Sequence, residues 1–237
     1  MGGPASDGVR GSGGRSPPGN NVGMHAGVKA LAADLQRIFG TRLQSVVAYR
    51  GDGDGDRVHT LALVEGITFS DLAACAPRTA DWRKAGAAAP LILTRDEFLR
   101  TLDVFPLEYG GIIASHQVVV GEDVLAGLRV SDTDLRRGIE LQAKSHLIHL
   151  REGYIESGGN PKAVGQLVTA SAPALSSLLA NLRRLDPAAA ERAGITGDLF
   201  KEIAGAANTT IADPSPLLAR YLGAVERLWQ EVDRWRA

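Results

Sequence analysis

Strand-type sequence stops near residue 130, and this change constrains the fold more than any other feature of the chain. Before it, short runs of apolar and β-branched residues at 43–49, 58–64, 90–93 and 118–120 are typical of strands and alternate with helical segments. After it, apolar residues recur every three or four positions, as in a helical bundle. The sequence therefore predicts an α+β chain: a mixed β-sheet flanked by helices, then an all-α bundle.

The predicted domain boundaries follow from this change. Residues 1–23 are mainly Gly, Ser, Pro and Asn with almost no large apolar side chain, so burial cannot offset the entropy lost on ordering them. We expect a disordered leader there, and Met24 is an alternative start to Met1. Residues 24–130 form the predicted α/β domain and residues 131–237 the predicted bundle.

Several helix starts are predicted from capping residues. Ser70 or Asp71 is expected to cap a helix in the first domain. Thr94, with Glu97 three residues later, has the spacing of a capping box. Ser131 or Asp132 is expected to cap the first bundle helix, whose apolar positions are Leu135, Ile139, Leu141, Leu147, Ile148, Leu150 and Ile155.

Composition excludes several functional classes. A formal net charge of -1 gives no bulk attraction for nucleic acid. Cys75 is the one cysteine, so no intrachain disulfide can form. No apolar run reaches the length of a membrane span, and we expect a cytoplasmic protein with no membrane partner.

One stretch resembles a known family. From Arg37 to Gly51 the order is a helix end with Phe39-Gly40, a strand, and a glycine turn, which resembles the opening of a nucleotidyltransferase domain. A bacterial branch of that superfamily, which joins this domain to a helical bundle, is also similar to the segments 82–86, 90–94, 103–109 and 116–123. The resemblance implies a nucleotidyltransferase-like α/β domain over the first half of the chain.

The resemblance also implies a chemistry, which this chain does not match. In the family a Gly-Ser turn holds the nucleotide phosphates, and an Asp-x-Asp pair with a third carboxylate binds Mg²⁺ for phosphoryl transfer. Gly51 fits the turn glycine, but Asp52 stands at the Ser position, and Thr60 and Ala62 stand at the Asp positions. We therefore expect a catalytically degenerate protein with no cofactor, which binds a nucleotide-like ligand or a protein.

Two alternatives remain open. In the first, the chain is an active metal-dependent nucleotidyltransferase in which Asp54, Asp56 or Glu108 supplies the Mg²⁺ contacts. In the second, it is a dimeric interaction protein, with Trp229 and Leu222 at a homodimer seam. For Glu108 the simpler interpretation is a residue that bonds neighbouring backbone N–H groups beside a Phe-Pro turn.

A cleft between the two domains is the expected ligand site. Gly51 and Asp52 would approach it from the sheet, and Arg136, Lys144 and Arg151 from the first bundle helix. The simpler account of the three basic residues is a solvated helix face, because acidic residues are interleaved with them. His146 and His149, three residues apart, are expected at the helix surface or in packing rather than as metal ligands.

Overall fold

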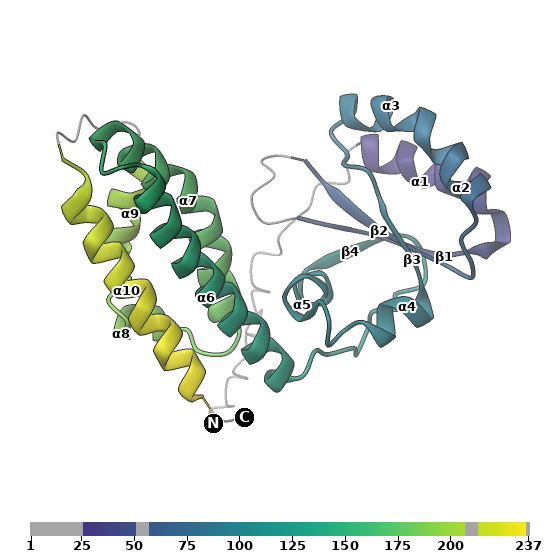
Figure 1. Ribbon diagram of the computed structural model, residues 1–237. Coiled ribbons are helices and arrows are strands. Elements are labelled where there is room, and N and C mark those ends of the chain that lie inside the picture. The colour runs from purple at the N-terminus through teal and green to yellow at the C-terminus, as the bar shows by residue number, and fades with distance from the viewer. Residues whose placement is uncertain (1–25, 51–56, 207–212, 236–237) are drawn as a thin grey trace, which may run out of the picture.

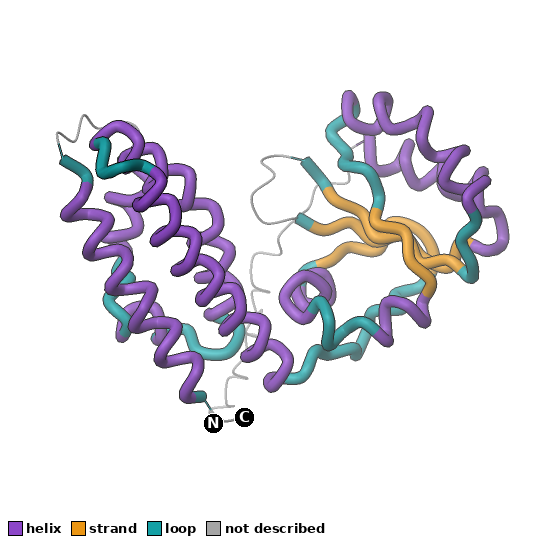
Figure 2. Tube along the Cα trace, viewed as in Figure 1, coloured by secondary structure: helices purple, strands orange, loops and turns teal. Residues whose placement is uncertain are grey.

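The computed structural model describes residues 26–50, 57–206 and 213–235, so the predicted leader lies outside it. Figure 1 shows a β-sheet covered by helices and, beside it, a helical bundle entered through the long helix α6 (Asp132–Glu156). Figure 2 shows the described strands in the first part alone. The predicted α+β class is confirmed at this level.

The sheet contains four described strands in the order β3-β2-β1-β4. They are β1 (Leu43–Tyr49), β2 (His59–Val64), β3 (Leu91–Thr94) and β4 (His116–Gly121). Strand β1 pairs antiparallel with β2 and β4, whereas β3 runs parallel to β2. The antiparallel β1–β2 pair confirms the strands predicted at 43–49 and 58–64, while residues 51–56 between them lie outside the described residues.

Helices cover both faces of the sheet (Figure 1). One layer contains α1 (Ala26–Phe39), α2 (Phe69–Cys75), the short 3-10 helix η2 (Ala76–Arg78) and α3 (Thr79–Lys84); the other contains α4 (Arg95–Arg100) and α5 (Pro106–Ala114). Side chains alternate between the faces of a strand. Val46 and Ala62 accordingly pack under α1, and Val47 and Leu61 pack under α4 and α5.

Helix α2 begins earlier than predicted, and the assignment of its cap to Ser70 or Asp71 is wrong. Thr68 is the N-cap: its hydroxyl accepts from the backbone N of Asp71, and the Asp71 carboxylate accepts from the backbone N of Thr68. Arg42 donates to both oxygens of Asp71, at 2.9 and 2.7 Å. This arginine contact, with the Thr68 bonds, holds the pKa of Asp71 well below its usual range.

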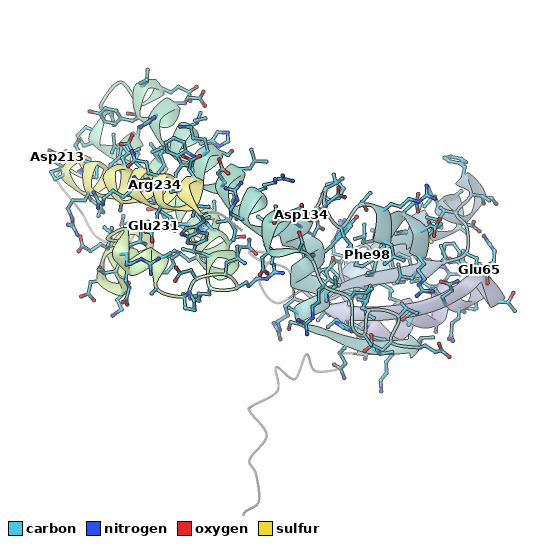
Figure 3. The ribbon with its side chains drawn as sticks, turned by 90° about the horizontal axis from the view of Figure 1, so that it is seen from below. Glu65, Phe98, Asp134, Asp213, Glu231 and Arg234 are labelled. Atoms are coloured by element: carbon cyan, nitrogen blue, oxygen red, sulfur yellow. The ribbon has the colours of Figure 1, made fainter. Side chains whose placement is uncertain are left out.

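The two other predicted caps are confirmed. Thr94 and Glu97 form the capping box of α4, and Ser131 caps α6 by accepting from the backbone N of Asp134. Figure 3 labels Asp134 where α6 leaves the sheet part, and Asp213 at the opposite end of the bundle.

The bundle has its own core. It contains α6, α7 (Pro161–Leu182), α8 (Ala189–Arg192), α9 (Gly197–Gly205) and α10 (Ser215–Arg234). Leu147 of α6, Leu175 of α7 and Tyr221 of α10 are fully buried in one cluster, which shares none of its buried members with the clusters under the sheet.

Helix α7 is the one described helix that is long and apolar enough, by length and composition, to cross a membrane. By that measure, the expectation that no stretch is long enough for a membrane span is not met. A core helix of a bundle meets the same criteria, and α7 buries Val168, Leu175 and Leu178 against its neighbours. The described structure therefore carries no strong membrane-protein signal.

Some apolar positions of α6 face solvent. Leu135, Ile139, Leu147 and Leu150 are buried, but Leu141, Ile148 and Ile155 are 72%, 40% and 77% exposed. The exposed residues are spaced by seven, so they follow one side of the helix. Helix α6 thus has an apolar face outside the bundle core.

The backbone near the start of α1 lies against the backbone that follows α3, and this contact gives a first prediction. A Cβ on Gly27 would lie 2.2 Å from the carbonyl oxygen of Ala85, which follows α3. Gly27→Ala is therefore expected to lower the free energy of unfolding by about 1–3 kcal/mol, as overpacking does, in urea titrations. Gly111→Ala in α5 is the control: its Cβ meets nothing within 4 Å, and helix propensity favours it by about 1 kcal/mol. Equal stability of Gly27→Ala and the wild type would contradict the packing.

Candidate functional site

The positions that the family resemblance assigns to metal binding lie inside the sheet. Thr60 and Ala62 of β2 are both 0% exposed. Ala62 packs under α1, and Thr60, two residues away, shares that face. The Thr60 hydroxyl has no hydrogen-bond partner within the part of the chain that the structure describes. A hydroxyl and a methyl group buried under a helix cannot bind Mg²⁺, which requires carboxylate, phosphate and water oxygens.

The other predicted carboxylates are not brought into such a site. Gly51, Asp52, Asp54 and Asp56 lie outside the described residues. Within residues 26–50, 57–206 and 213–235, no group of three or more His, Cys, Asp or Glu side chains is arranged to hold a metal ion. The described residues therefore do not fit the family's metal.

Glu108 is an exposed residue in the first turn of α5. Its carboxylate is close enough to Tyr49 of β1 to affect that phenol. Burial first, and then the charge of Glu108, raise the pKa of Tyr49 to about 12. Glu108 also lines a groove between the two parts of the molecule.

Arg136, Lys144 and Arg151 face α10, and the expectation that they line an interdomain cleft does not match this placement. Arg136 bonds Glu140 at 2.7 Å and the Val232 carbonyl at 3.4 Å. The ammonium of Lys144 lies 3.4 Å from the centroid of the Trp229 ring, and Arg151 forms a 2.8 Å ion pair with Glu226. All three therefore serve the contact between α6 and α10.

A groove does lie between the two parts, on another side of α6. It has a volume of about 420 Å³ and is bounded by the chain entering α5, by α6, and by Ala174 of α7. Its apolar lining contains Val104, Phe105, Pro106, Leu107 and Leu141. Its polar lining contains Glu108, Gln142, Ser145, His146 and His149. We call this feature the α5–α6 groove.

Two glycines allow the walls of the groove to approach. A Cβ on Gly138 of α6 would lie 3.0 Å from side-chain carbons of Pro106 and Leu107. A Cβ on Gly110 of α5 would lie 2.1 Å from the guanidinium of Arg184, which follows α7. That guanidinium donates to the Leu107 carbonyl at 3.1 Å, so it ties the bundle to α5.

Stacked aromatic rings support the side of the groove that residues 104–108 form. Phe98 of α4 stacks on Tyr109 of α5 with ring centroids 4.6 Å apart, and Tyr109 contacts Phe105 at 5.4 Å. Phe98 lies over the sheet (Figure 3). The ring of Phe105 is therefore supported from the sheet core, although it is 47% exposed.

A buried histidine of α6 belongs to the polar lining of the groove. His146 is 7% exposed, and its Nε2 lies 2.5 Å from the hydroxyl of Tyr221 on α10. Burial, and then the neighbouring His149, lower the pKa of His146 to about 4. The ring is therefore neutral at pH 7, which suits hydrogen bonding to a neutral ligand.

The α5 side of the groove is not predicted from the sequence, because no helix is predicted over residues 106–114. Pro106 at the first helical position and Glu108 at the third were a usable signal for a helix start. The groove itself had no sequence signal, because it depends on where α5 meets α6.

No protein-family model, no curated protein and no solved structure matches the chain. The groove is therefore the feature that bears on function.

His146 gives a prediction on pH dependence. Its pKa is near 6.5 when unfolded and about 4 when folded, so the unfolded chain binds more protons between these values. Stability is expected to fall as pH drops from about 6.5 to 4, by at most on the order of 3 kcal/mol from this group. The measurement is urea unfolding at pH 7 and pH 4.5.

The comparison variants are His146→Gln, which removes the titrating group, and His149→Gln, which removes an exposed histidine one turn away. The carboxylates are the same in the wild type and both variants, so their protonation lowers the stability of all three proteins equally. We expect the free energy of unfolding to fall less between pH 7 and pH 4.5 in His146→Gln than in the wild type or His149→Gln. An equal fall in the free energy of unfolding in all three proteins would contradict the lowered pKa of His146.

Proposed function

We propose that this protein is a binding module that takes a small apolar ligand in the α5–α6 groove, and that it is not a metal-dependent nucleotidyltransferase. The observation that carries the proposal is an open groove whose lining is mostly apolar, with a few polar side chains from both sides. The volume of about 420 Å³ falls in the range of small-molecule sites, which are mostly apolar with a few placed polar groups.

The exposed apolar side chains support a ligand. Val104, Phe105 and Leu141 are 60%, 47% and 72% exposed, and all three line the groove. Grouped apolar surface of this kind often marks a binding site. Burying it against a ligand releases water and contributes about 25 cal/mol per Å² of apolar surface.

The charge of the groove argues against a nucleoside triphosphate. None of its lining residues in the described chain is Lys or Arg, and Glu108 is acidic. Phosphates are usually held by cationic side chains, by metal ions or by rows of backbone N–H groups. We therefore expect an uncharged, apolar ligand in place of the nucleotide-like ligand that the sequence suggested.

The two alternatives have less support. An active transferase using Asp54 and Asp56 depends on residues outside those described, and Glu108 is exposed on α5. For a dimer through Leu222 and Trp229, both residues pack partly against the bundle core, and Lys144 covers the Trp229 ring. The proposal keeps the cytoplasm as the location, where the buried free thiol of Cys75 is stable.

A fluorescence titration with N-phenyl-1-naphthylamine, a neutral apolar fluorophore, tests the proposal. The wild type is expected to bind it and enhance its emission. Leu141→Ser is expected to weaken binding about tenfold, since removing one apolar contact of this size costs roughly 1.4 kcal/mol. Ile155→Ser is the matched control, because Ile155 is as exposed on the same helix but does not line the groove.

Calorimetry with ATP, GTP, CTP and UTP, each with and without Mg²⁺, accompanies this titration. No metal-dependent binding is expected. Tight binding that needs Mg²⁺ would move the transferase hypothesis to first place. Equal effects of Leu141→Ser and Ile155→Ser on the fluorophore would show that it binds elsewhere.

A further inference from the structure

A chain of polar contacts leads from the α5–α6 groove into the core of the bundle. His146 lines the groove, and its Nε2 lies 2.5 Å from the Tyr221 hydroxyl. Ser171 of α7 lies 3.3 Å from the same hydroxyl, and its own Oγ is 2.7 Å from the Val168 carbonyl. Tyr221 is 0% exposed, so these contacts are shielded from water.

The lengths of these contacts assign the protons. The Ser171 proton goes to the Val168 carbonyl, because that contact is much the shorter of the two that Ser171 makes. The Tyr221 hydroxyl then donates to the nearer of its two neighbours, which is Nε2 of His146. A neutral imidazole that accepts at Nε2 carries its proton at Nδ1. His146 therefore has an N–H donor at Nδ1.

This donor lacks a protein partner. Within the described residues, the one hydrogen bond of His146 is the bond to Tyr221. Because Nε2 is engaged there and the ring lines the groove, Nδ1 is the nitrogen left for a ligand. Nδ1 is not among the described buried polar atoms that lack a partner, so it is open to the groove, where a ligand can supply the acceptor.

We propose that His146 is the polar anchor of the groove and donates a hydrogen bond from Nδ1 to the carbonyl oxygen of a small, neutral, apolar molecule. This inference rests on the proposed function and names the ligand class for the same site. Tyr221 acts as a positioning residue, because it sets the tautomer of His146 without lining the groove.

The walls specify the rest of the ligand. Phe105, Leu107 and Leu141 offer apolar contact to a hydrocarbon or aromatic body. Glu108 disfavours a carboxylate in place of the neutral carbonyl, since it would place two like charges in one groove. A ketone, an ester or an amide on an apolar body meets both conditions.

The tautomer is tested directly by ¹⁵N NMR of the wild-type protein labelled at its histidines. Long-range imidazole correlations at pH 7 distinguish a proton at Nδ1 from a proton at Nε2, and the His146→Asn variant identifies the His146 signals. A proton at Nδ1 is expected. A proton at Nε2 would overturn the donor, and with it the ligand class.

The ligand class is tested with two fluorophores of similar size. Prodan carries a ketone on an apolar naphthalene, whereas N-phenyl-1-naphthylamine has no carbonyl. His146→Leu is expected to weaken prodan binding about tenfold, the effect of losing one hydrogen bond from a buried donor, and to change the affinity for N-phenyl-1-naphthylamine much less, because that fluorophore has no carbonyl. His146→Asn places an amide at the position of Nδ1 and is expected to keep more prodan affinity than Leu.

The outcomes separate this inference from the proposed function. If neither fluorophore binds the wild type, the groove is not an apolar ligand site and both proposals fail. If both bind but His146→Leu affects them equally, the anchor alone fails. Circular dichroism melting confirms that each variant is folded at the assay temperature; should His146→Leu not fold, the tautomer measured in the wild type still decides.

Discussion

The contact between α5 and the start of α6 determines where this molecule has a site. Pro106 and Leu107 rest on Gly138, where an added Cβ would lie 3.0 Å from a carbon of each side chain and would require those side chains to shift. Arg184 reaches from the end of α7 to the Leu107 carbonyl and fixes the same junction from the bundle side. The sheet part and the bundle are otherwise separate cores, so their meeting here creates the groove.

The sheet, by contrast, offers little room for chemistry. Its inner strands have apolar residues on both faces, and helices bury both. The resemblance to nucleotidyltransferases placed Asp-type positions at Thr60 and Ala62, yet both are fully buried on the α1 face. An ionised carboxylate there would lose its hydration without gaining a partner, which is strongly unfavourable. The small, uncharged residues now present are what this packing tolerates.

Local sequence signals predicted much of the fold. The strand at 43–49, the Thr94 capping box and the Ser131 cap depend on neighbours within a few residues, and each was identified. The cap of α2 was misplaced because Thr68, Ser70 and Asp71 all suit a helix start. The capping box between Thr68 and Asp71 favours Thr68, and the Arg42 contact to Asp71, across 29 residues, holds that carboxylate in place.

The candidate site was much less predictable, for a physical reason. Helical periodicity shows that Leu141 and Leu147 are both apolar positions, but it does not show that one faces the core and the other a groove. His146 looked like an ordinary packing residue, because its partner Tyr221 lies 75 residues away. A site built from one wall of each domain leaves no spacing pattern in the sequence.

The basic residues of α6 also show that the sequence does not reveal which residues meet across the fold. Arg136, Lys144 and Arg151 suggested a ligand cleft, but they contact α10 at the Val232 carbonyl, the Trp229 ring and Glu226, respectively. The His146–Tyr221 bond lies in this same seam between α6 and α10. The three basic residues thus hold α10 against α6, and α10 is the helix that carries Tyr221, the hydrogen-bond partner of His146.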